Sequence, residues 1–487
     1  MNKFSPLAVI DIGSNSIRLV IFDCKKKFAI PIFNEKTQCG LGSDLRISKM
    51  LPNEACLRAN KVIERYISIS RSINCELVIV GTAAIREALN GKEFVHKINQ
   101  NFNVSILILS SKEEARFSYL GVLSSFNDPK GFIGDLGGGS LELVSSKDIK
   151  FENTITLPLG TLQFRDIYKK KEELTELIDK YLDQSSWLKN EKNKSFYAIG
   201  GAWRSLAKVF MSWSNYPISV IHHYEISLSR AVDICRVLSN LNYSLKSMSV
   251  ISKSRRKSVP YSALLLERIL LKIEPQNIIF SSYGLREGIL FDRLDENDKK
   301  EDSLVSYCRK ISKNESRFYE NIKNYFKWLH PIIKKFPDNE LRLAEAACYL
   351  SDIAWKIHPE YRAEFALKKV IYAPFVEVNH SERLYIAKVL FKRYKGDLEK
   401  NKEYNEYNIL SASRLERAII IGVALDFAYT ITGSSSGNIF DCEMSFNKNN
   451  LLISLKNNLK INYNRACDKK IKILSNLLKC EYKVINL

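Results

Sequence analysis

Apolar residues in this 487-residue chain follow two different periods, and the change between them divides the sequence. Up to about Leu294, short apolar runs such as LAVIDI and ELVIVG alternate with stretches in which apolar positions recur every three or four residues. This alternation predicts strands that alternate with helices, which is typical of an α/β fold. From Leu304 to about Thr432 the spacing is helical, and a short mixed pattern of strands and one helix follows.

The expected elements of the α/β part are read from its apolar runs and turn signals. They are a strand–turn–strand unit at 7–22, a helix at 52–73, strand-to-helix units at 76–90 and 104–125, a glycine-rich hairpin at 132–146, a strand at 152–160, a helix at 170–187, and strand-to-helix units at 195–210 and 275–294. We expect four domains, residues 1–128, 129–303, 304–432 and 433–487. The polar stretch DENDKKEDS, residues 295–303, is the expected linker, and GSSSGN, residues 433–438, is a second loop signal.

A glycine-rich turn occurs twice in nearly the same form. Residues 11–20 read DIGSNSIRLV and residues 135–144 read DLGGGSLELV, so that Asp, Gly, Ser, Leu and Val coincide. One copy would be explained by a plain hairpin turn, whereas two copies indicate a repeated device. Successive backbone N–H groups in such a turn can converge on an anion. We therefore expect phosphate to be bound by Ser14, Asn15 and Ser16 in the first turn and by Gly137, Gly138, Gly139 and Ser140 in the second. Asp11 and Asp135 precede the turns and would hold Mg²⁺.

Charge and cysteine content narrow the class of protein. The 74 Lys and Arg residues exceed the 54 Asp and Glu residues, which gives a net charge of +20 and favours a polyanionic partner. A general enrichment in Lys, Asn and Ile explains the same excess equally well. No basic stripe interleaved with aromatic residues stands out, so we expect no nucleic-acid partner. The ten cysteines form no close Cys-x-x-Cys pair and read as reduced thiols. Neither a membrane span nor a secretory signal is visible, and we expect a cytoplasmic protein with no membrane partner.

The two turns resemble the phosphate loops of the acetate-kinase, sugar-kinase, heat-shock chaperone and actin superfamily. Together with GTAAIREALN, SSKEEARFSYLGV, AIGGAWRSL and SYGLREGIL, in this order, they resemble the exopolyphosphatase/guanosine pentaphosphate phosphohydrolase (Ppx/GppA) family over residues 7 to about 294. The resemblance implies two actin-like (ribonuclease H-like) α/β domains around a cleft, followed by a helical HD-like domain and a small α+β C-terminal subdomain. It also implies a homodimer.

The resemblance further implies that water removes a terminal phosphoryl group. Glu114 would be the general base, Arg86 would reach phosphate, and Glu142 would contact the metal or the water. Each of these residues has a plainer interpretation. Glu113 and Glu114 fit an acidic first turn of a helix after Ser110-Ser111, Arg86 fits an exposed helix position, and Glu142 fits a cross-strand partner of Arg18.

Three further stretches leave their roles open. Gly200 and Gly201 match a turn that holds a nucleoside in the kinases of the superfamily, or they serve strand-to-helix packing. The stretch RRKS, residues 255–258, either contacts a polyanionic chain along the cleft or forms a solvated loop. In the helical third, Ser351-Asp352 stands where the His-Asp pattern has its pair, so we expect no second metal centre there.

The expected function is Mg²⁺-dependent hydrolysis of the terminal phosphate of inorganic polyphosphate. The alternative within the family is guanosine pentaphosphate (pppGpp) as the substrate. Two readings from other classes stay open. An ATP-dependent sugar or acetate kinase would share the turns but should lack the Glu-Glu-Ala-Arg motif, and a non-catalytic polyphosphate-binding regulator would need no base.

Overall fold

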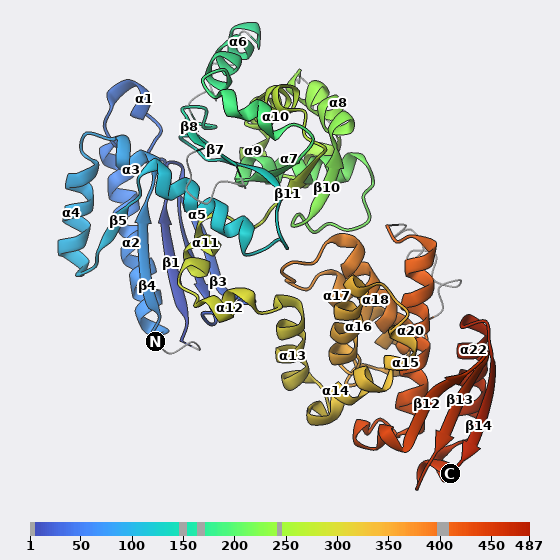
Figure 1. Cartoon of the computed structure of the whole chain (residues 1–487). Coiled ribbons are helices and arrows are strands. Elements are labelled where there is room, and N and C mark those ends of the chain that lie inside the picture. Colours follow the sequence, from blue (N-terminus) through green and yellow to red (C-terminus); the bar gives the residue numbers. More distant parts are fainter. Residues whose placement is uncertain (1–4, 146–152, 163–170, 241–245, 397–408) are drawn as a thin grey trace. The chain divides into compact units, whose positions relative to one another are not determined.

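The computed structural model describes residues 5–145, 153–162, 171–240, 246–396 and 409–487. The chain divides into two compact units, Met1–Glu301 and Asp302–Leu487, which are described separately (Figure 1). Within these described ranges, none of the helices combines the length and the apolar character needed to cross a bilayer.

The first unit opens with a five-stranded sheet in the order β3-β2-β1-β4-β5. Its first three strands are antiparallel neighbours, whereas β4 and β5 run parallel to β1. The strands are β1 (Leu7–Ile12), β2 (Ser16–Phe22), β3 (Pro31–Gln38), β4 (Glu76–Gly81) and β5 (Ile106–Ile108).

The second sheet of this unit repeats the same order, read as β8-β7-β6-β9-β11, and adds the antiparallel strand β10 at its edge. Again the first three strands are antiparallel and the next two are parallel. The strands are β6 (Gly131–Leu136), β7 (Leu141–Ser145), β8 (Thr154–Leu157), β9 (Ser195–Ile199), β10 (Tyr224–Ser227) and β11 (Asn277–Phe280). The repeated order confirms the predicted pair of actin-like α/β domains.

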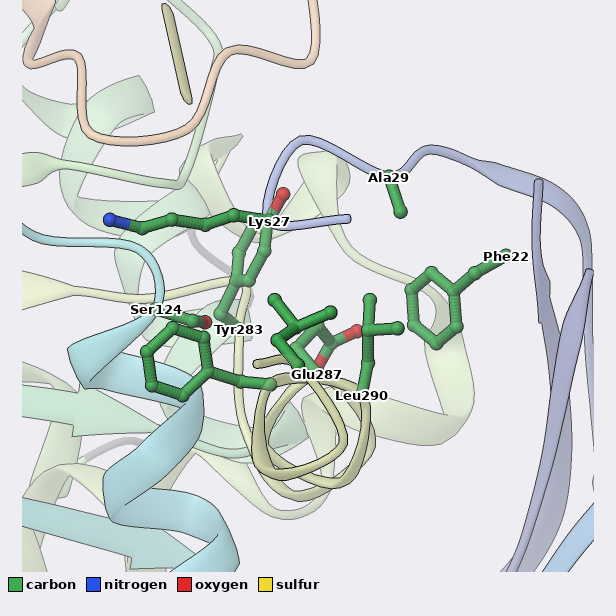
Figure 2. A pocket seen from close by; sticks show the side chains of 9 residues that line it. Phe22, Lys27, Ala29, Ser124, Tyr283, Glu287 and Leu290 are labelled. Atoms are coloured by element: carbon green, nitrogen blue, oxygen red, sulfur yellow. The ribbon is translucent and has the colours of Figure 1, made fainter. Parts of the chain in front are cut away.

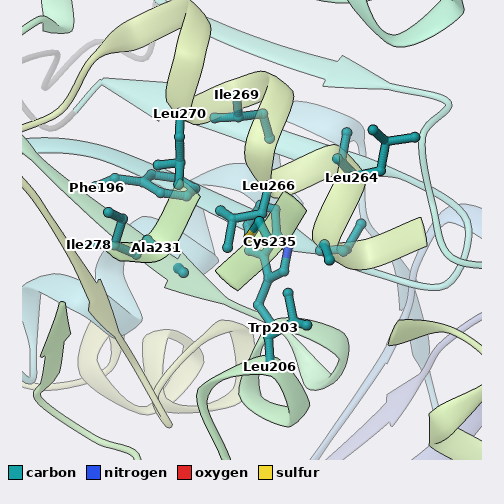
Figure 3. Close-up of a cluster of buried hydrophobic side chains, with 14 of the residues drawn as sticks. Phe196, Trp203, Leu206, Ala231, Cys235, Leu264, Leu266, Ile269, Leu270 and Ile278 are labelled. Carbon is teal, nitrogen blue, oxygen red and sulfur yellow. The ribbon is translucent and has the colours of Figure 1, made fainter. Parts of the chain in front are cut away.

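Apolar helices cover these sheets. In the second domain, Trp203 and Leu206 of α7 and Leu266 and Leu270 of α10 are buried against Phe196 of β9 (Figure 3). The helices of the first unit are α1 (Leu45–Ser48), α2 (Asn53–Ser72), α3 (Ala83–Glu87), α4 (Gly91–Phe102), α5 (Ser111–Leu123), α6 (Lys171–Leu182), α7 (Gly201–Trp213), α8 (Leu228–Ser239), α9 (Lys253–Arg256), α10 (Val259–Ile273), α11 (Leu285–Asp292) and α12 (Glu296–Lys300), with 3₁₀ helices at Ser186–Glu191 and Lys246–Val250.

Helices α5 and α11 are exchanged between the two sheets. Helix α5 ends the first domain along the chain, yet Ala115 and Val122 pack with Ile133 and Tyr197 of the second sheet. Helix α11 ends the second domain, yet its residues from Ile289 to Leu294 pack with the first sheet. A division of the chain at residues 128 and 303 therefore follows the sheets but not the helices.

The two exchanged helices meet backbone to backbone through glycine. A Cβ atom at Gly121 would lie 2.2 Å from the carbonyl oxygen of Gly284, and one at Gly288 would lie 1.8 Å from that of Phe117. Real Cβ atoms do not approach backbone so closely, so only glycine permits this crossing.

The structure differs from the expected elements in a few places. The edge strand β3 was not expected, because its residues are mostly polar and half-exposed and show no apolar run. The expected linker at 295–303 contains the short helix α12, whose N-cap is the Asp295 side chain. Residue Lys170, the expected start of α6, lies outside the described residues.

The second unit is helical and ends in a three-stranded sheet, β12-β13-β14. Its helices are α13 (Ser303–Glu315), α14 (Tyr319–Trp328), α15 (His330–Ile333), α16 (Asp338–Leu350), α17 (Arg362–Ile371), α18 (His380–Arg393), α20 (Ala412–Ile431), α21 (Leu459–Asn462) and α22 (Arg465–Leu477), with 3₁₀ helices at Pro359–Tyr361 and Ser436–Asp441 and strands β12 (Cys442–Asn447), β13 (Asn450–Leu455) and β14 (Glu481–Asn486).

The buried Asp352 of this unit is held by Arg317. Arg317 donates from Nη2 to one carboxylate oxygen at 2.6 Å, and from Nε and its backbone N–H to the other at 3.1 and 2.9 Å. This aspartate therefore serves an ion pair inside the helical unit.

Candidate active site

The two predicted turns have the same closed geometry. In the β1–β2 turn, the backbone N–H of Gly13 donates to the carbonyl oxygen of Ser16 at 3.1 Å. In the β6–β7 turn, the N–H of Gly137 donates to the carbonyl oxygen of Ser140 at 3.0 Å. The repeated sequence therefore encodes a repeated backbone shape.

The two turns also face and touch each other. A Cβ atom at Gly139 would lie 2.9 Å from Ser14 Oγ, and one at Gly138 would lie 3.4 Å from Ser14 Cβ. Gly160 supports the second turn from behind, because a Cβ there would lie 2.2 Å from the carbonyl carbon of Gly139. The structure thus brings the two predicted phosphate turns into contact, with Gly138 and Gly139 packed against Ser14.

Strand register gives the two copies different chemistry. Asp11 of β1 lies opposite Arg18 of β2, and Asp135 of β6 lies opposite Glu142 of β7. Glu142 is therefore the cross-strand neighbour of Asp135, and the interpretation that makes it the partner of Arg18 is wrong. The first hairpin presents an acid beside a base, whereas the second presents two acids.

Helix capping and catalysis were both considered for the neighbouring acids Glu113 and Glu114, and the structure gives these two residues different surroundings. The Glu113 carboxylate accepts from the Ser110 backbone N–H at 2.8 Å and from Ser110 Oγ at 2.7 Å, which completes a capping box at the start of α5. Glu114 lies one position further around the helix and is only 13% exposed. The capping role thus belongs to Glu113 and leaves Glu114 available for chemistry.

Glu114 is paired with Arg86 of α3. Arg86 Nη1 donates to Glu114 Oε2 at 2.8 Å and to the carbonyl oxygen of Leu109 at 2.9 Å. Arg86 is only 18% exposed, so the exposed-helix interpretation of this residue is wrong. Its buried Nη2 has no hydrogen-bond partner among the described residues. A buried donor of this kind is suited to a phosphate oxygen.

Burial raises the pKa of Glu114 to about 7, while Arg86 opposes the rise and the charges of Asp135 and Asp11 add to it. A carboxylate with a pKa near neutrality is poised to exchange a proton with a bound water.

The other three acids are also held above their usual pKa. Burial raises the pKa of Asp11 and of Asp135, and burial with the charges of Glu114 and Asp135 raises the pKa of Glu142. Ser118 donates to Asp135 Oδ2 at 2.6 Å, and Ser140 donates to Glu142. These groups therefore form one buried cluster of negative charge, which a divalent cation would offset.

No group of three or more His, Cys, Asp or Glu residues in the described parts of the chain forms a ready metal site. Mg²⁺ ordinarily takes one or two protein carboxylates together with substrate phosphates. The carboxylate oxygens of Asp11, Asp135 and Glu142 fit that chemistry.

A group of five cations accompanies the acids, and only Arg255 of these had been considered as a ligand. We call it the cation group, and it consists of Arg18, Lys36, Arg204, Arg255 and Arg286. Burial and the charges of Arg286 and Arg204 lower the pKa of Arg18 to about 10. Desolvation and repulsion from the other four lower the pKa of Lys36 to about 8, although this side chain still meets solvent on the edge strand β3. Because these cations repel one another, an anion bound near them would be electrostatically favourable.

Arg286 connects the cation group to the acids. Its Nη1 lies 3.5 Å from Asp11 Oδ2, and its buried Nε has no hydrogen-bond partner among the described residues. Arg255 donates to the carbonyl oxygen of Gly201 and to Ser205 Oγ, both at 3.1 Å, which places RRKS beside the third glycine turn. The five residues of the cation group come from β2, β3, α7, α9 and α11, so no local sequence motif indicates the group.

A pocket of about 250 Å³ lies beside α11 (Figure 2). Its wall is mostly apolar and includes Phe22, Leu290 and Phe291, with Glu287 at one side. None of the predicted site residues lines this pocket, whose polar lining consists of Lys27, Ser124, Tyr283 and Glu287.

Comparison with known proteins gives one family along most of the chain. The model of the Ppx/GppA phosphatase family matches residues 20–297, and the model described as "Exopolyphosphatase, C-terminal" matches residues 332–478.

The named relatives include proteins of both activities considered for this chain. The guanosine-5'-triphosphate,3'-diphosphate pyrophosphatase of Pseudoalteromonas atlantica is 23% identical over 62% of this chain, and the match spans only 62% of that relative's length. Exopolyphosphatase 1 of Mycobacterium leprae is 24% identical over 59% of this chain and 89% of its own length. A crystal structure of the Aquifex aeolicus family member is 25% identical, with a TM-score of 0.51 over 59% of this chain and 97% of that one.

Proposed function

Because the chain belongs to the Ppx/GppA phosphatase family, we propose that it hydrolyses the terminal phosphoanhydride bond of inorganic polyphosphate. The observation that carries the proposal is the meeting of the two glycine turns in one unit with the Arg86–Glu114 pair. A substrate of this kind needs an anion cradle, a base for water and a surrounding of positive charge.

In the proposed reaction, Glu114 accepts a proton from a water molecule that attacks the terminal phosphorus. The new P–O bond forms as the bond to the bridging oxygen breaks, and that oxygen leaves on the shortened chain. Backbone N–H groups of the two turns and the free Nη2 of Arg86 stabilise the charge on the transferred phosphoryl oxygens. The protein therefore acts mainly by positioning and by electrostatics.

Mg²⁺ is the proposed cofactor, and one or two of the predicted ligands Asp11, Asp135 and Glu142 would hold it together with substrate phosphates. When bound, Mg²⁺ would neutralise charge on the phosphate oxygens. The raised pKa values of these acids support a cation requirement, because burial disfavours their charged forms and a bound cation would favour them.

Polyphosphate is preferred over pppGpp as the substrate because of the cation group. Five cations in mutual electrostatic reach suit a long run of consecutive phosphates better than the triphosphate and diphosphate of pppGpp. The predicted homodimer and the predicted cytoplasmic location stay predictions.

The test supplies the purified full chain, with Mg²⁺, with polyphosphate and with pppGpp in separate assays of phosphate release. We expect a higher kcat/KM for polyphosphate. The variant Lys36→Gln should raise KM for polyphosphate several-fold and change kcat little, since it lies in the cation group and not beside Glu114. A higher kcat/KM for pppGpp would reverse the order of the two substrates.

Hydrolysis of pppGpp is the second candidate, favoured by the relatives named guanosine-5'-triphosphate,3'-diphosphate pyrophosphatase. The third glycine turn is the position at which a nucleoside would be expected, and only Arg255 approaches within 4 Å of a Cβ position at Gly201. Phosphorylation of an acceptor by ATP would instead favour a kinase, and binding without phosphate release would favour a regulator.

The pH dependence of polyphosphate hydrolysis should follow Glu114. Because its pKa is about 7, the carboxylate is protonated below that pH, and the rate should rise with pH through about 7 and then level off. Arg86→Gln removes the charge that lowers this pKa, so the midpoint should move to higher pH and the loss of rate should be largest at acidic pH. The measurement is a kcat/KM profile from pH 5 to 9, with values taken about every half unit.

Arg116→Gln is the matched control, because Arg116 lies on α5, the helix that carries Glu114, but pairs with Asp292. Its midpoint should equal that of the native protein. If the midpoint does not move in Arg86→Gln, the pH dependence of the rate does not arise from ionisation of Glu114.

A further inference from the structure

Three exposed aromatic side chains lie on α17 or at its two ends, and Figure 1 shows the place of this helix in the second unit. Tyr361 is 60% exposed, Phe365 is 37% exposed and Tyr372 is 54% exposed. Spacings of four and seven residues place all three on one face of the helix, and Lys368 lies on the same face. Large aromatic side chains are ordinarily withdrawn from water, so a line of three marks an interaction surface.

Two further aromatic residues, Trp355 and Phe318, belong to neighbouring segments, since Arg317, the residue before Phe318, lies over the Trp355 ring. Trp355 is half-buried, and its Nε1 donates to the carbonyl oxygen of Glu315 at 2.9 Å. The carboxylate of Glu315 pairs with Lys369 of α17, which ties the end of α13 to α17. Phe318, in the loop after α13, is 46% exposed. We call these five aromatic residues, from Phe318 to Tyr372, the aromatic face.

Cations lie against the rings of the aromatic face. Lys356 Nζ is 5.3 Å from the centre of the Trp355 ring, and both Lys356 and Lys368 are exposed. Lys369 and Arg317 also lie against the Phe365 and Trp355 rings, but they are paired with Glu315 and Asp352. Between residues 355 and 372 the chain carries four Lys or Arg residues against two Glu residues. The surface therefore combines flat apolar rings with positive charge.

We propose that the aromatic face binds a single-stranded nucleic acid. Rings exposed in a row provide stacking positions for bases, and cations beside them meet the backbone phosphates. Inorganic polyphosphate has no bases and would gain nothing from the rings. A second copy of the chain, packed through the same face, would bring like charges together. The expectation of no nucleic-acid partner arose because these residues come from three separate segments and form no stripe in the sequence.

The test measures binding of a fluorescent 12-nucleotide single strand of mixed sequence to the full chain, by anisotropy at two salt concentrations. The triple variant Tyr361→Ala, Phe365→Ala, Tyr372→Ala should weaken this binding at least tenfold. Phe440→Ala is the control, because Phe440 is 48% exposed elsewhere in the same unit. The same variants should bind and hydrolyse polyphosphate as the native protein does.

Three results would overturn the proposal. The first is unchanged oligonucleotide affinity in the triple variant. The second is equal weakening of polyphosphate and oligonucleotide binding, which would assign the face to charge alone. The third is a change of oligomeric state by sedimentation with unchanged oligonucleotide binding, which would assign the face to a second copy. Because phosphate release is measured separately, failure of this proposal is distinguishable from failure of the proposed hydrolase function.

Discussion

Replacing Glu114 by glutamine is expected to lower kcat for polyphosphate hydrolysis by about 10²–10⁴-fold, the range ordinarily contributed by a general base. Glutamine keeps the size of the side chain and its acceptor oxygen toward Arg86, but it cannot take a proton from water. Binding of polyphosphate should persist, because the turns and the cation group are untouched. Phosphate release and a direct binding assay on the same preparation separate the two effects.

Glu113→Gln is the matched control for this variant. Glu113 caps α5 and is exposed, so its replacement should leave kcat within about twofold and cost at most about 1 kcal/mol of stability. Full activity of Glu114→Gln would remove the base from the mechanism, and equal losses in both variants would point to damage to the helix.

Gly160→Ala is expected to lower activity at least tenfold although Gly160 belongs to neither hairpin. The new methyl group would lie 2.2 Å from Gly139 and 2.4 Å from the backbone of Gly138 and of Ser140, so the second turn must move. A shift of about 1 Å in a positioning element can cost about 10²-fold in rate. Overpacking at such a site costs about 1–3 kcal/mol. Thermal unfolding and polyphosphate hydrolysis measure the two effects.

Gly201→Ala is the control, because only the Arg255 side chain lies within 4 Å of its Cβ position, at 3.8 Å. Its activity on polyphosphate should stay near the native value. Native activity in Gly160→Ala would show that the second turn tolerates displacement and does not hold the reacting phosphate.

The features predicted correctly from the sequence are those that a short segment determines by itself. The paired turns were visible because their Asp, Gly and Ser positions repeat within ten residues, and the resemblance to a family separated Glu114 from Glu113. The central strands of both sheets were visible as apolar runs, whereas the edge strands β3 and β10 were not.

What escaped prediction depends on residues that are distant in the sequence. Lys36 lies on β3, whose polar residues give no strand signal, and its proximity to Arg204 and Arg286 exists only once two sheets and α11 have come together. The same holds for the register that sets Glu142 opposite Asp135. The net charge of the chain indicated an anionic ligand, but it did not indicate where in the fold the ligand would bind.

The exchange of α5 and α11 has a consequence for how the polypeptide acquires its structure during synthesis. One covering layer of the first sheet includes Phe117 of α5 but is completed only by residues up to Leu294, so the ribosome must extend almost three hundred amino acids before that surface can be fully shielded from water. Contacts that close such long loops form slowly, and the uncovered apolar surface is prone to aggregate meanwhile. A nascent chain stalled ahead of α11 should therefore depend on chaperones, whereas one released beyond it should not.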